Sequence, residues 1–501
     1  MRRHILVPLL VAPSFGLRTF EPPPPPVTTR NNITEHWFTV RLNHFMAHNN
    51  ETFQMRFYYN NEFVNASHIP EIVVFVGGEW AIYPGWVGGG LAHELASILH
   101  AGLFYTEHRY YGLTRPTANT TVSELRYLNV DQALADLAQF IEYVKSEQFE
   151  NGIYRNSKVV LVGCSYAGSM ATWMRLAYPH LVDAVFSDSG PLHAQEDFPE
   201  YLEVITEALR TQGSEECLSS VSEAVQLMVE LLETEDGAAT ISSLFNTCSP
   251  IDTSSEWDIP TFFWYGITET FAALVQYATP GNIPAACAVL TNSNISDPVQ
   301  RLANWITAQS WTQPCIESRY SEVVTAHTNT DYDSPNSVMR LWTYQTCVEY
   351  GWYQTTTSSR QPFLSTVPLE YFHQMCKDFY SIDFDEVRLR QGIVRTNNLF
   401  AGLTHLPDYS VSVAGGHDPW SPMGPNVTHA TALASVYVVP GVSHCRAITA
   451  TGNSDTEELE RVKQAVLSDL HLYITGIPLT KAANVAVPPL VLIVAVTFAM
   501  I

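Results

Sequence analysis

The fold of this chain is decided by the stretch Val159-Val160-Leu161-Val162-Gly163-Cys164-Ser165-Tyr166-Ala167-Gly168. A short β-branched and leucine run ends in small residues around Ser165, and a helical pattern follows until Tyr178-Pro179. Strand, tight turn and helix in this order push a serine hydroxyl out of the sheet edge at a helix N-terminus, where backbone N–H groups favour negative charge. The stretch therefore predicts a nucleophile that attacks a carbonyl group.

This stretch departs from the strict pattern G-x-S-x-G at one position. The fifth place holds Ala167, and Gly168 stands one residue later. Small residues after a strand also serve simply to let a helix pack closely on a sheet. The alternative is therefore a structural turn without chemistry.

Two later strand-like segments supply the partners that a serine nucleophile needs. Residues 409–414 are followed by Asp418, and residues 435–439 are followed by His444. Active sites of open α/β sheets collect at the carboxyl ends of the strands, and Ser165, Asp418, His444 is the hydrolase order of nucleophile, acid and base. The imidazole takes the serine proton, and the carboxylate fixes the tautomer of the imidazole. Asp418 precedes Pro419, and Asp before Pro is common turn chemistry, so a plain turn residue is the alternative for Asp418. Asp408, before Tyr409, is a rival acid, whereas Asp188 is expected to be structural.

The oxyanion that forms on attack needs two N–H donors. The expected donors are the backbone N–H groups of Tyr166, directly after the nucleophile, and of Gly78, in the loop Gly77-Gly78-Glu79-Trp80 that follows a strand at 72–76. A tight turn without a catalytic role is the alternative for this loop. Glu79 is expected either to meet the free amino group of a peptide or to be solvated, and both interpretations stay open.

Composition limits the classes of function. The chain has 501 residues, 46% of them hydrophobic, enough for two to three domains with a large core. Fifty acidic residues against 26 basic ones give a net charge of -24, which repels phosphate backbones and argues against a nucleic-acid partner. No C-x-x-C or H-E-x-x-H spacing occurs, so we predict no metal site and no cofactor.

The eight cysteines fall into two groups. Cys164 and Cys445 stand beside the predicted nucleophile and base. The other six lie in the middle of the chain and are expected to pair among themselves, with their connectivity open: Cys217, Cys248, Cys287, Cys315, Cys347 and Cys376.

Both ends of the chain resemble processing signals. Residues 1–20 are typical of a signal peptide, and residues 21–36 form a Pro-rich spacer. The hydrophobic tail at 477–501 is expected to be a GPI signal, with a retained short membrane segment or a frayed end as alternatives. These features predict the secretory pathway, ending outside the cell, on its surface or in the lysosome. Six glycosylation sequons agree with it, at Asn32, Asn50, Asn65, Asn119, Asn294 and Asn426.

Between the two ends the chain divides into three blocks. Residues 37–193 alternate strand and helix patterns, which predicts the first part of an α/β core with a mostly parallel sheet. Residues 194–389 change to helical patterns with aromatic residues and are expected to form an inserted, Cys-rich helical cap. Residues 390–476 return to strand signals and are expected to complete the core with the acid and the base.

Several motifs resemble one peptidase family. They are Gly77-Gly78-Glu79, Glu107-His108-Arg109-Tyr110-Tyr111-Gly112, the run at 128–136, the run at 163–168, Asp418-Pro419-Trp420-Ser421 and Ser443-His444-Cys445. Together they resemble the serine carboxypeptidase family of lysosomal prolyl carboxypeptidase, dipeptidyl peptidase 2 and thymus-specific serine protease, most of all the thymus-specific branch and its invertebrate relatives. The resemblance covers roughly residues 37–473.

This resemblance implies an α/β-hydrolase fold with a helical domain inserted before the acid, and cleavage of peptides near their ends, often after proline. It implies Ser165, Asp418 and His444 as the triad and Trp420 as a wall of the pocket for the residue before the scissile bond. Ser169 stands where several relatives have a Met beside that pocket, which weakens the case for proline. Removal of a carboxyl-terminal residue and removal of an amino-terminal dipeptide both stay open.

The expected partner is thus a peptide substrate, with membrane attachment through the tail and a homodimer as further expectations. Two other classes of function remain as alternatives. One is an ester or lipid hydrolase on the same fold. The other is a catalytically silent surface binding protein.

Overall fold

The computed structural model describes residues 23–26, 32–65, 69–309, 314–452 and 455–479. The predicted signal peptide and most of the predicted tail signal lie outside these residues. Within them, no helix combines the length and the apolar character that crossing a membrane requires.

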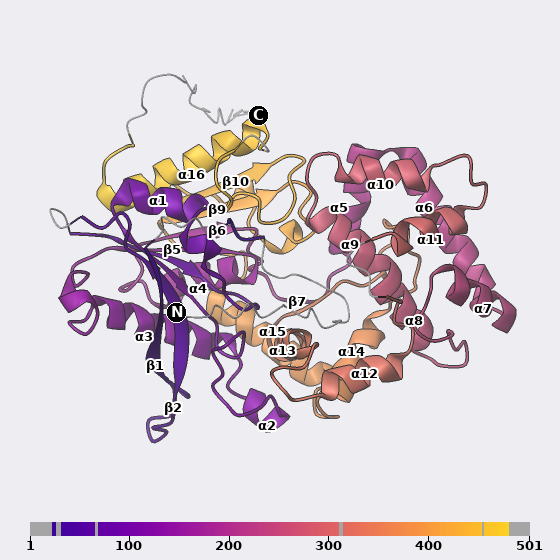
Figure 1. Cartoon of the computed structure of the whole chain (residues 1–501), viewed down its shortest axis with the longest axis horizontal. Helices are drawn as coiled ribbons and strands as arrows, with labels where there is room; N and C mark the ends of the chain where they lie inside the picture. The colour runs from indigo at the N-terminus through magenta and orange to yellow at the C-terminus, as the bar shows by residue number, and fades with distance from the viewer. Residues whose placement is uncertain (1–22, 27–31, 66–68, 310–313, 453–454, 480–501) are drawn as a thin grey trace, which may run out of the picture.

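A sheet of eight strands forms the core of the molecule (Figure 1), in the order β1-β2-β4-β3-β5-β6-β9-β10. β1 and β2 pair antiparallel, β2 is antiparallel to β4, and all later neighbours are parallel. This order, with helices on both faces, is that of an α/β-hydrolase, and the predicted fold class is confirmed. The strands are β1 (Ile33–Arg41), β2 (Thr52–Asn60), β3 (Ile72–Val76), β4 (Gly102–Thr106), β5 (Val159–Cys164), β6 (Ala184–Asp188), β9 (Ser410–Gly415) and β10 (Ala434–Val439).

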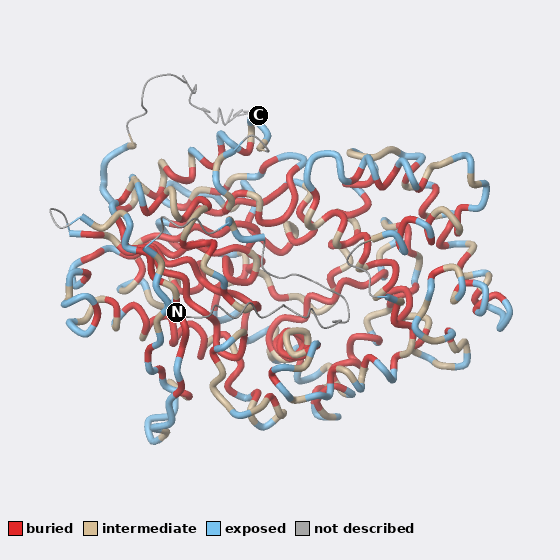
Figure 2. Tube along the Cα trace, in the orientation of Figure 1, coloured by how far each residue is buried: buried red, intermediate tan, exposed pale blue. Residues whose placement is uncertain are grey.

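The central strands are apolar along their whole length because helices cover both faces of the sheet. Every residue of β3, β4, β5 and β6 is buried, as expected for parallel strands between two helix layers. α1 (Leu91–Leu99) and α16 (Glu457–Thr475) cover one face, and α3 (Val130–Lys145) and α4 (Tyr166–Ala177) the other (Figure 1). Figure 2 shows the buried residues concentrated in this layered body.

A mostly helical segment separates β6 from β9 and forms the second lobe in Figure 1. Its elements are β7 (Gln195–Asp197), α5 (Glu200–Ala208), η3 (Leu209–Gly213), α6 (Glu215–Leu231), α7 (Glu235–Leu244), α8 (Asp258–Phe262), η4 (Phe263–Thr268), α9 (Glu269–Gln276), α10 (Asn282–Leu290), α11 (Pro298–Thr307), α12 (Tyr320–Thr328), α13 (Ser337–Gln345), η5 (Thr346–Tyr350), β8 (Gly351–Tyr353), α14 (Leu369–Phe379) and α15 (Glu386–Phe400). Short helices elsewhere are η1 (Pro84–Val87), α2 (Val122–Leu125), η2 (Glu150–Gly152), η6 (Ser421–Met423) and η7 (Val427–His429).

Two predicted boundaries need correction. β1 begins at Ile33, so residues 33–36 pair with β2 and belong to the sheet instead of the spacer. α15 runs across the boundary expected at 389/390 and contacts both α4 of the core and η5 of the insertion. Composition changes gradually at these places, whereas hydrogen bonding fixes where an element begins.

The six central cysteines form three disulfides, and the prediction that they pair among themselves is confirmed. The bonds join Cys217 to Cys287, Cys248 to Cys315 and Cys347 to Cys376. All three lie in the segment between β6 and β9. Cys164 and Cys445 take part in none of these disulfides, and both are buried.

The asparagines of the predicted sequons lie at or near the surface. Asn119 is partly buried, and the other five are exposed. Glycosylation of these residues stays a prediction.

Candidate active site

Ser165 occupies a strained turn between β5 and α4. Its backbone angles are φ 55° and ψ -136°, and a positive φ of this kind is costly for a residue with a side chain. Its N–H group donates to the Asp188 carbonyl oxygen at 2.9 Å, which ties the turn to the end of β6. Strain of this kind is typical of a serine presented at the top of a sheet.

The glycines around Ser165 explain the departure from the strict pattern. A Cβ atom on Gly163 would overlap the Ala167 carbonyl oxygen, so only glycine fits there. A Cβ atom on Gly168 would lie 2.7 Å from Ser187 Oγ, whereas Ala167 is accommodated in the core. The close helix-to-sheet approach therefore falls at position 168 in this chain, one residue later than the pattern expects.

His444 and Asp418 are hydrogen-bonded at the same edge of the sheet. His444 Nδ1 lies 2.8 Å from Asp418 Oδ1, which also accepts the Trp420 N–H at 2.9 Å. A carboxylate can only accept, so Nδ1 carries the proton and Nε2 is left as an acceptor. Nε2 is buried and has no hydrogen-bond partner in the described part of the chain. Ser165 Oγ is therefore not hydrogen-bonded to Nε2 in this structure.

The loops that carry Ser165 and His444 meet through their neighbours. The Cys445 thiol, directly after His444, is hydrogen-bonded to the thiol of Cys164, directly before Ser165, and burial raises the pKa of the Cys445 thiol well above its ordinary value. The Cys445 N–H group donates to Ser189 Oγ at 3.0 Å. These contacts place the loop of His444 beside the turn of Ser165.

The two other aspartates considered as acids have different positions. Asp408 precedes β9 and lies at the opposite edge of the sheet from Asp418, with its carbonyl oxygen accepting from Arg175 Nε at 3.0 Å. Asp188 is fully buried at the end of β6, and one of its carboxylate oxygens accepts the N–H groups of Ala447 and Ile448 at 2.7 and 2.9 Å. Burial raises the pKa of Asp188 to about 6. Asp188 anchors the loop after His444.

A cavity opens at Ser165 between the sheet edge and the insertion. The core supplies Trp420, which also donates through Nε1 to Gln276 Oε1 at 3.1 Å. The cavity is lined by Glu79, Ser165, Tyr166, Pro191, Gln276, Tyr277, Trp342, Trp352 and Trp420. Its walls therefore come from both parts of the chain, and they are mostly aromatic.

Ser169 lies outside this cavity, and its expected place as a pocket wall is corrected. Its side chain is fully buried, and its Oγ donates to the Pro191 carbonyl oxygen at 2.5 Å. The first turn of α4 directs this residue toward the loop after β6. Ser169 supports Pro191, which itself lines the cavity.

Glu79 is buried beside Ser165, so the interpretation of a solvated side chain is wrong. Only 3% of Glu79 is exposed, and its Oε2 has no hydrogen-bond partner among the described residues. Burial raises the pKa of Glu79 to about 8, because the interior disfavours an unpaired negative charge.

We expect this buried carboxyl to make the stability of the protein depend on pH. Between about pH 4.5 and 8 the folded chain keeps a proton on Glu79 that the unfolded chain releases, so the folded state loses stability as the pH rises. In Glu79→Gln, the free energy of unfolding should therefore fall less steeply with pH, by about 1.4 kcal/mol per pH unit. Urea unfolding at several pH values measures this slope. Glu207→Gln, at an exposed carboxyl, should keep the wild-type slope, and equal slopes for all three proteins would contradict the prediction.

The sequence did not single out the four cavity walls that the insertion supplies, Gln276, Tyr277, Trp342 and Trp352. It also missed a polar network on Tyr166, whose Oη lies 3.0 Å from Gln345 Nε2 and 3.3 Å from both Tyr350 Oη and His108 Nε2. Burial lowers the pKa of His108 to about 4. Through this network the insertion helps to fix Tyr166, the residue that follows Ser165.

The motif at 107–112 contributes structure beside the site. Arg109 Nε and Nη2 each lie 2.6 Å from a carboxylate oxygen of Asp136, in a buried bidentate pair. Glu107 accepts from the backbone N–H and the hydroxyl of Thr114, both at 2.8 Å. These contacts hold the loop after β4 against α3.

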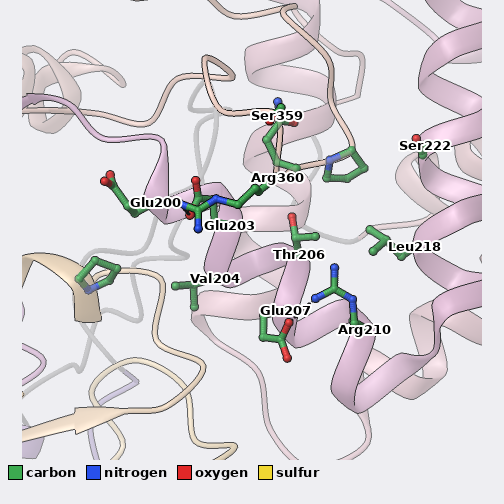
Figure 3. A pocket seen from close by; sticks show the side chains of 13 residues that line it. Glu200, Glu203, Val204, Thr206, Glu207, Arg210, Leu218, Ser222, Ser359 and Arg360 are labelled. Carbon is green, nitrogen blue, oxygen red and sulfur yellow. Dashed lines mark hydrogen bonds and ion pairs between the residues drawn. The ribbon is translucent and has the colours of Figure 1, made fainter.

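A second cavity of about 620 Å³, here called the outer cavity, is lined mainly by residues of α5, α6 and the loop at 359–362 (Figure 3). Glu203 pairs with Arg360 at 2.6 Å, and Glu207 pairs with Arg210. The residues that line it are Glu200, Glu203, Val204, Thr206, Glu207, Arg210, Leu218, Ser222, Ser359, Arg360, Gln361, Pro362 and Pro422. They include no His or Cys, so this outer cavity lacks the base that serine chemistry needs.

Comparisons with known proteins agree with the predicted resemblance. Thymus-specific serine protease of Mus musculus is 29% identical over 460 residues, which cover 88% of this chain and 87% of that protein. Lysosomal Pro-X carboxypeptidase of Homo sapiens is 25% identical over 444 residues, 84% of each chain. An esterase structure from Pyrobaculum calidifontis matches with a TM-score of 0.33 and 12% identity over 90% of this chain and 85% of that chain, a likeness that says nothing about substrate. Serine carboxypeptidase S28 matches residues 40–466, and the chain therefore belongs to this family and is a serine peptidase.

Proposed function

We propose that this protein is a serine exopeptidase in which Ser165 is the nucleophile, His444 the general base and Asp418 the residue that orients the base. The observation that carries the proposal is the buried His444–Asp418 hydrogen bond, which leaves Nε2 as an unused acceptor at the sheet edge where Ser165 is presented. A serine hydroxyl is a weak nucleophile until such an imidazole takes its proton.

The reaction follows from these positions. Ser165 Oγ attacks the scissile carbonyl carbon while His444 Nε2 takes the hydroxyl proton, and Nε2 then gives that proton to the leaving amine. A water molecule hydrolyses the acyl-enzyme by the same transfers. The N–H groups of Tyr166 and Gly78 are the proposed oxyanion donors, each contributing several kcal/mol in the transition state.

Two observations support an exopeptidase, the enclosure of the cavity and the name of one relative, and a third supports proline before the scissile bond. The inserted helical segment, which we take as a cap over about 194–389, supplies walls of the cavity at Ser165. A site enclosed between a core and a cap admits chain ends more readily than the middle of a folded protein. The aromatic walls suit a small apolar residue such as proline before the scissile bond, and one relative is named a Pro-X carboxypeptidase.

The names of the relatives also support a place in the lysosome or elsewhere in the secretory pathway. The acidic composition, with 50 acidic and 26 basic residues, suits an acidic or extracellular compartment. Three disulfides require an oxidising compartment during folding.

The test is to label the protein with a fluorophosphonate and to map the adduct by mass spectrometry. We expect one adduct, on Ser165, and in a peptide-library digest cleavage only near chain ends. An adduct on another serine would overturn the assignment of the nucleophile. Turnover of p-nitrophenyl esters with no peptide cleaved would favour the ester hydrolase, and efficient cutting inside folded proteins would contradict the cap.

A further inference from the structure

We propose that Glu79 binds the free α-ammonium group of the substrate, so that this enzyme removes a short fragment from the amino end of a peptide. This inference builds on the proposed function, because it assumes that Ser165 is the nucleophile of the same cavity. It assigns a specificity-determining role to a side chain that the reaction itself does not use.

Glu79 is the one carboxyl group among the nine residues that line the cavity, and none of the nine is Lys, Arg or His. The side chain is 97% buried, since 3% is exposed, and its Oε2 has no hydrogen-bond partner in the described part of the chain. Glu79 acts electrostatically on the phenols of Tyr111 and Tyr166, and burial together with this carboxyl raises the pKa of both phenols above the ordinary value. An acceptor without a partner is costly inside a protein, and a ligand that donates hydrogen bonds would remove this cost.

The charge of the lining discriminates between the two ends of a peptide. A carboxyl terminus would find no Lys, Arg or His side chain among the residues that line this cavity. An ammonium group would favour the ionised form of Glu79, which would release its proton to solvent on binding and accept a charge-assisted hydrogen bond from the ammonium group. It would also meet the aromatic faces of Trp342, Trp352 and Trp420, which attract cations. The lining therefore favours an amino terminus.

The position of Glu79 limits the length of the fragment. Glu79 directly follows Gly78, whose N–H group is the proposed donor to the scissile carbonyl oxygen, and it shares the cavity with Ser165. An extended peptide advances by about 3.3 Å per residue. An ammonium group held at Glu79 thus lies one or two residues from the bond that Ser165 attacks, and the product is a single residue or a dipeptide.

The decisive experiment compares matched substrates on the wild-type enzyme. One pair is Ala-Pro-p-nitroanilide with and without an N-acetyl group, and a second pair is a short peptide with a free or an amidated carboxyl end. We expect acetylation to lower kcat/KM by at least about 100-fold, since a site built for a polar group rejects an analogue that lacks it. Amidation should change kcat/KM by less than about threefold. Equal cleavage of the acetylated and free substrates, or loss of cleavage on amidation, would overturn the proposal.

Variants connect this effect to the residue. In Glu79→Gln, kcat/KM for the free-amine substrate should fall by at least about 100-fold, and the penalty for acetylation should shrink to a few-fold. Glu207→Gln, at a carboxyl in the outer cavity, should behave as wild type. Fluorophosphonate labelling of the wild type and both variants separates the role of Glu79 from the proposed function. If Ser165 is labelled but the wild type cleaves acetylated and free substrates equally, only the role of Glu79 is overturned. If Ser165 of the wild type is not labelled, the proposed function is overturned.

Discussion

Ser165→Ala is expected to lower kcat/KM for peptide cleavage by about 10⁴- to 10⁶-fold and to abolish fluorophosphonate labelling. Without Oγ no acyl-enzyme forms, and the residual rate comes from substrate binding and the oxyanion donors alone. The backbone at Ser165 has a positive φ, which is about as costly for alanine as for serine. The substitution therefore adds no backbone strain, and the variant should fold like the wild type. Steady-state kinetics with chromogenic peptides, together with gel-based labelling, measures both effects.

The matched control is Ser222→Ala, at a serine that lines the outer cavity. It should keep wild-type kinetics and labelling. If Ser165→Ala kept the label while circular dichroism showed a native fold, Ser165 would have no place in the mechanism.

Asp418→Asn is expected to reduce kcat by about 10⁴-fold while leaving the structure intact. The Asp418 carboxylate accepts from His444 Nδ1 at 2.8 Å, which leaves Nε2 free to take a proton. An amide at this position favours the other tautomer, in which Nε2 carries the hydrogen and cannot act as a base. The variant should still be labelled, but slowly, and the rate of labelling measures the loss of the base.

Asp408→Asn is the control for this second prediction. Asp408 is exposed and precedes β9, at the other edge of the sheet. Its replacement should change kcat by less than about twofold, as is usual for a surface substitution. A large loss in Asp408→Asn with normal rates in Asp418→Asn would reverse the assignment of the acid.

Much of the fold could be predicted because its signals are local. The apolar run of β5, the small residues around Ser165 and the helical pattern after it are features of one short stretch, and the strands before Asp418 and His444 have the same character. Parallel topology then brings the ends of these strands to one edge. The proximity of Asp418 and His444 could therefore be predicted from the two strand signals and the expectation of a parallel sheet.

The substrate-facing residues could not be predicted in the same way. Gln276, Trp342 and Trp352 belong to helices and a short strand of the insertion, where most aromatic residues are core. Periodicity tells which face of a helix is apolar, but it does not tell which apolar side chain borders a cavity. Ser169 shows the converse: its position beside the elbow suggested a pocket wall, whereas the direction of the first turn of α4 aims it at Pro191.

The sequence also could not predict which cysteines form disulfides with each other, since six cysteines allow 15 different sets of pairs. Only the three-dimensional path of the insertion selects Cys217–Cys287, Cys248–Cys315 and Cys347–Cys376.

The confinement of all three bridges to the segment before β9 has a consequence during translation. The last bridged cysteine, Cys376, leaves the ribosome before the residues that carry Asp418 and His444. Oxidation of the segment between β6 and β9 therefore requires nothing from the end of the chain. A nascent chain can therefore carry all three disulfides while it still lacks Asp418 and His444, the two residues that we propose as partners of Ser165.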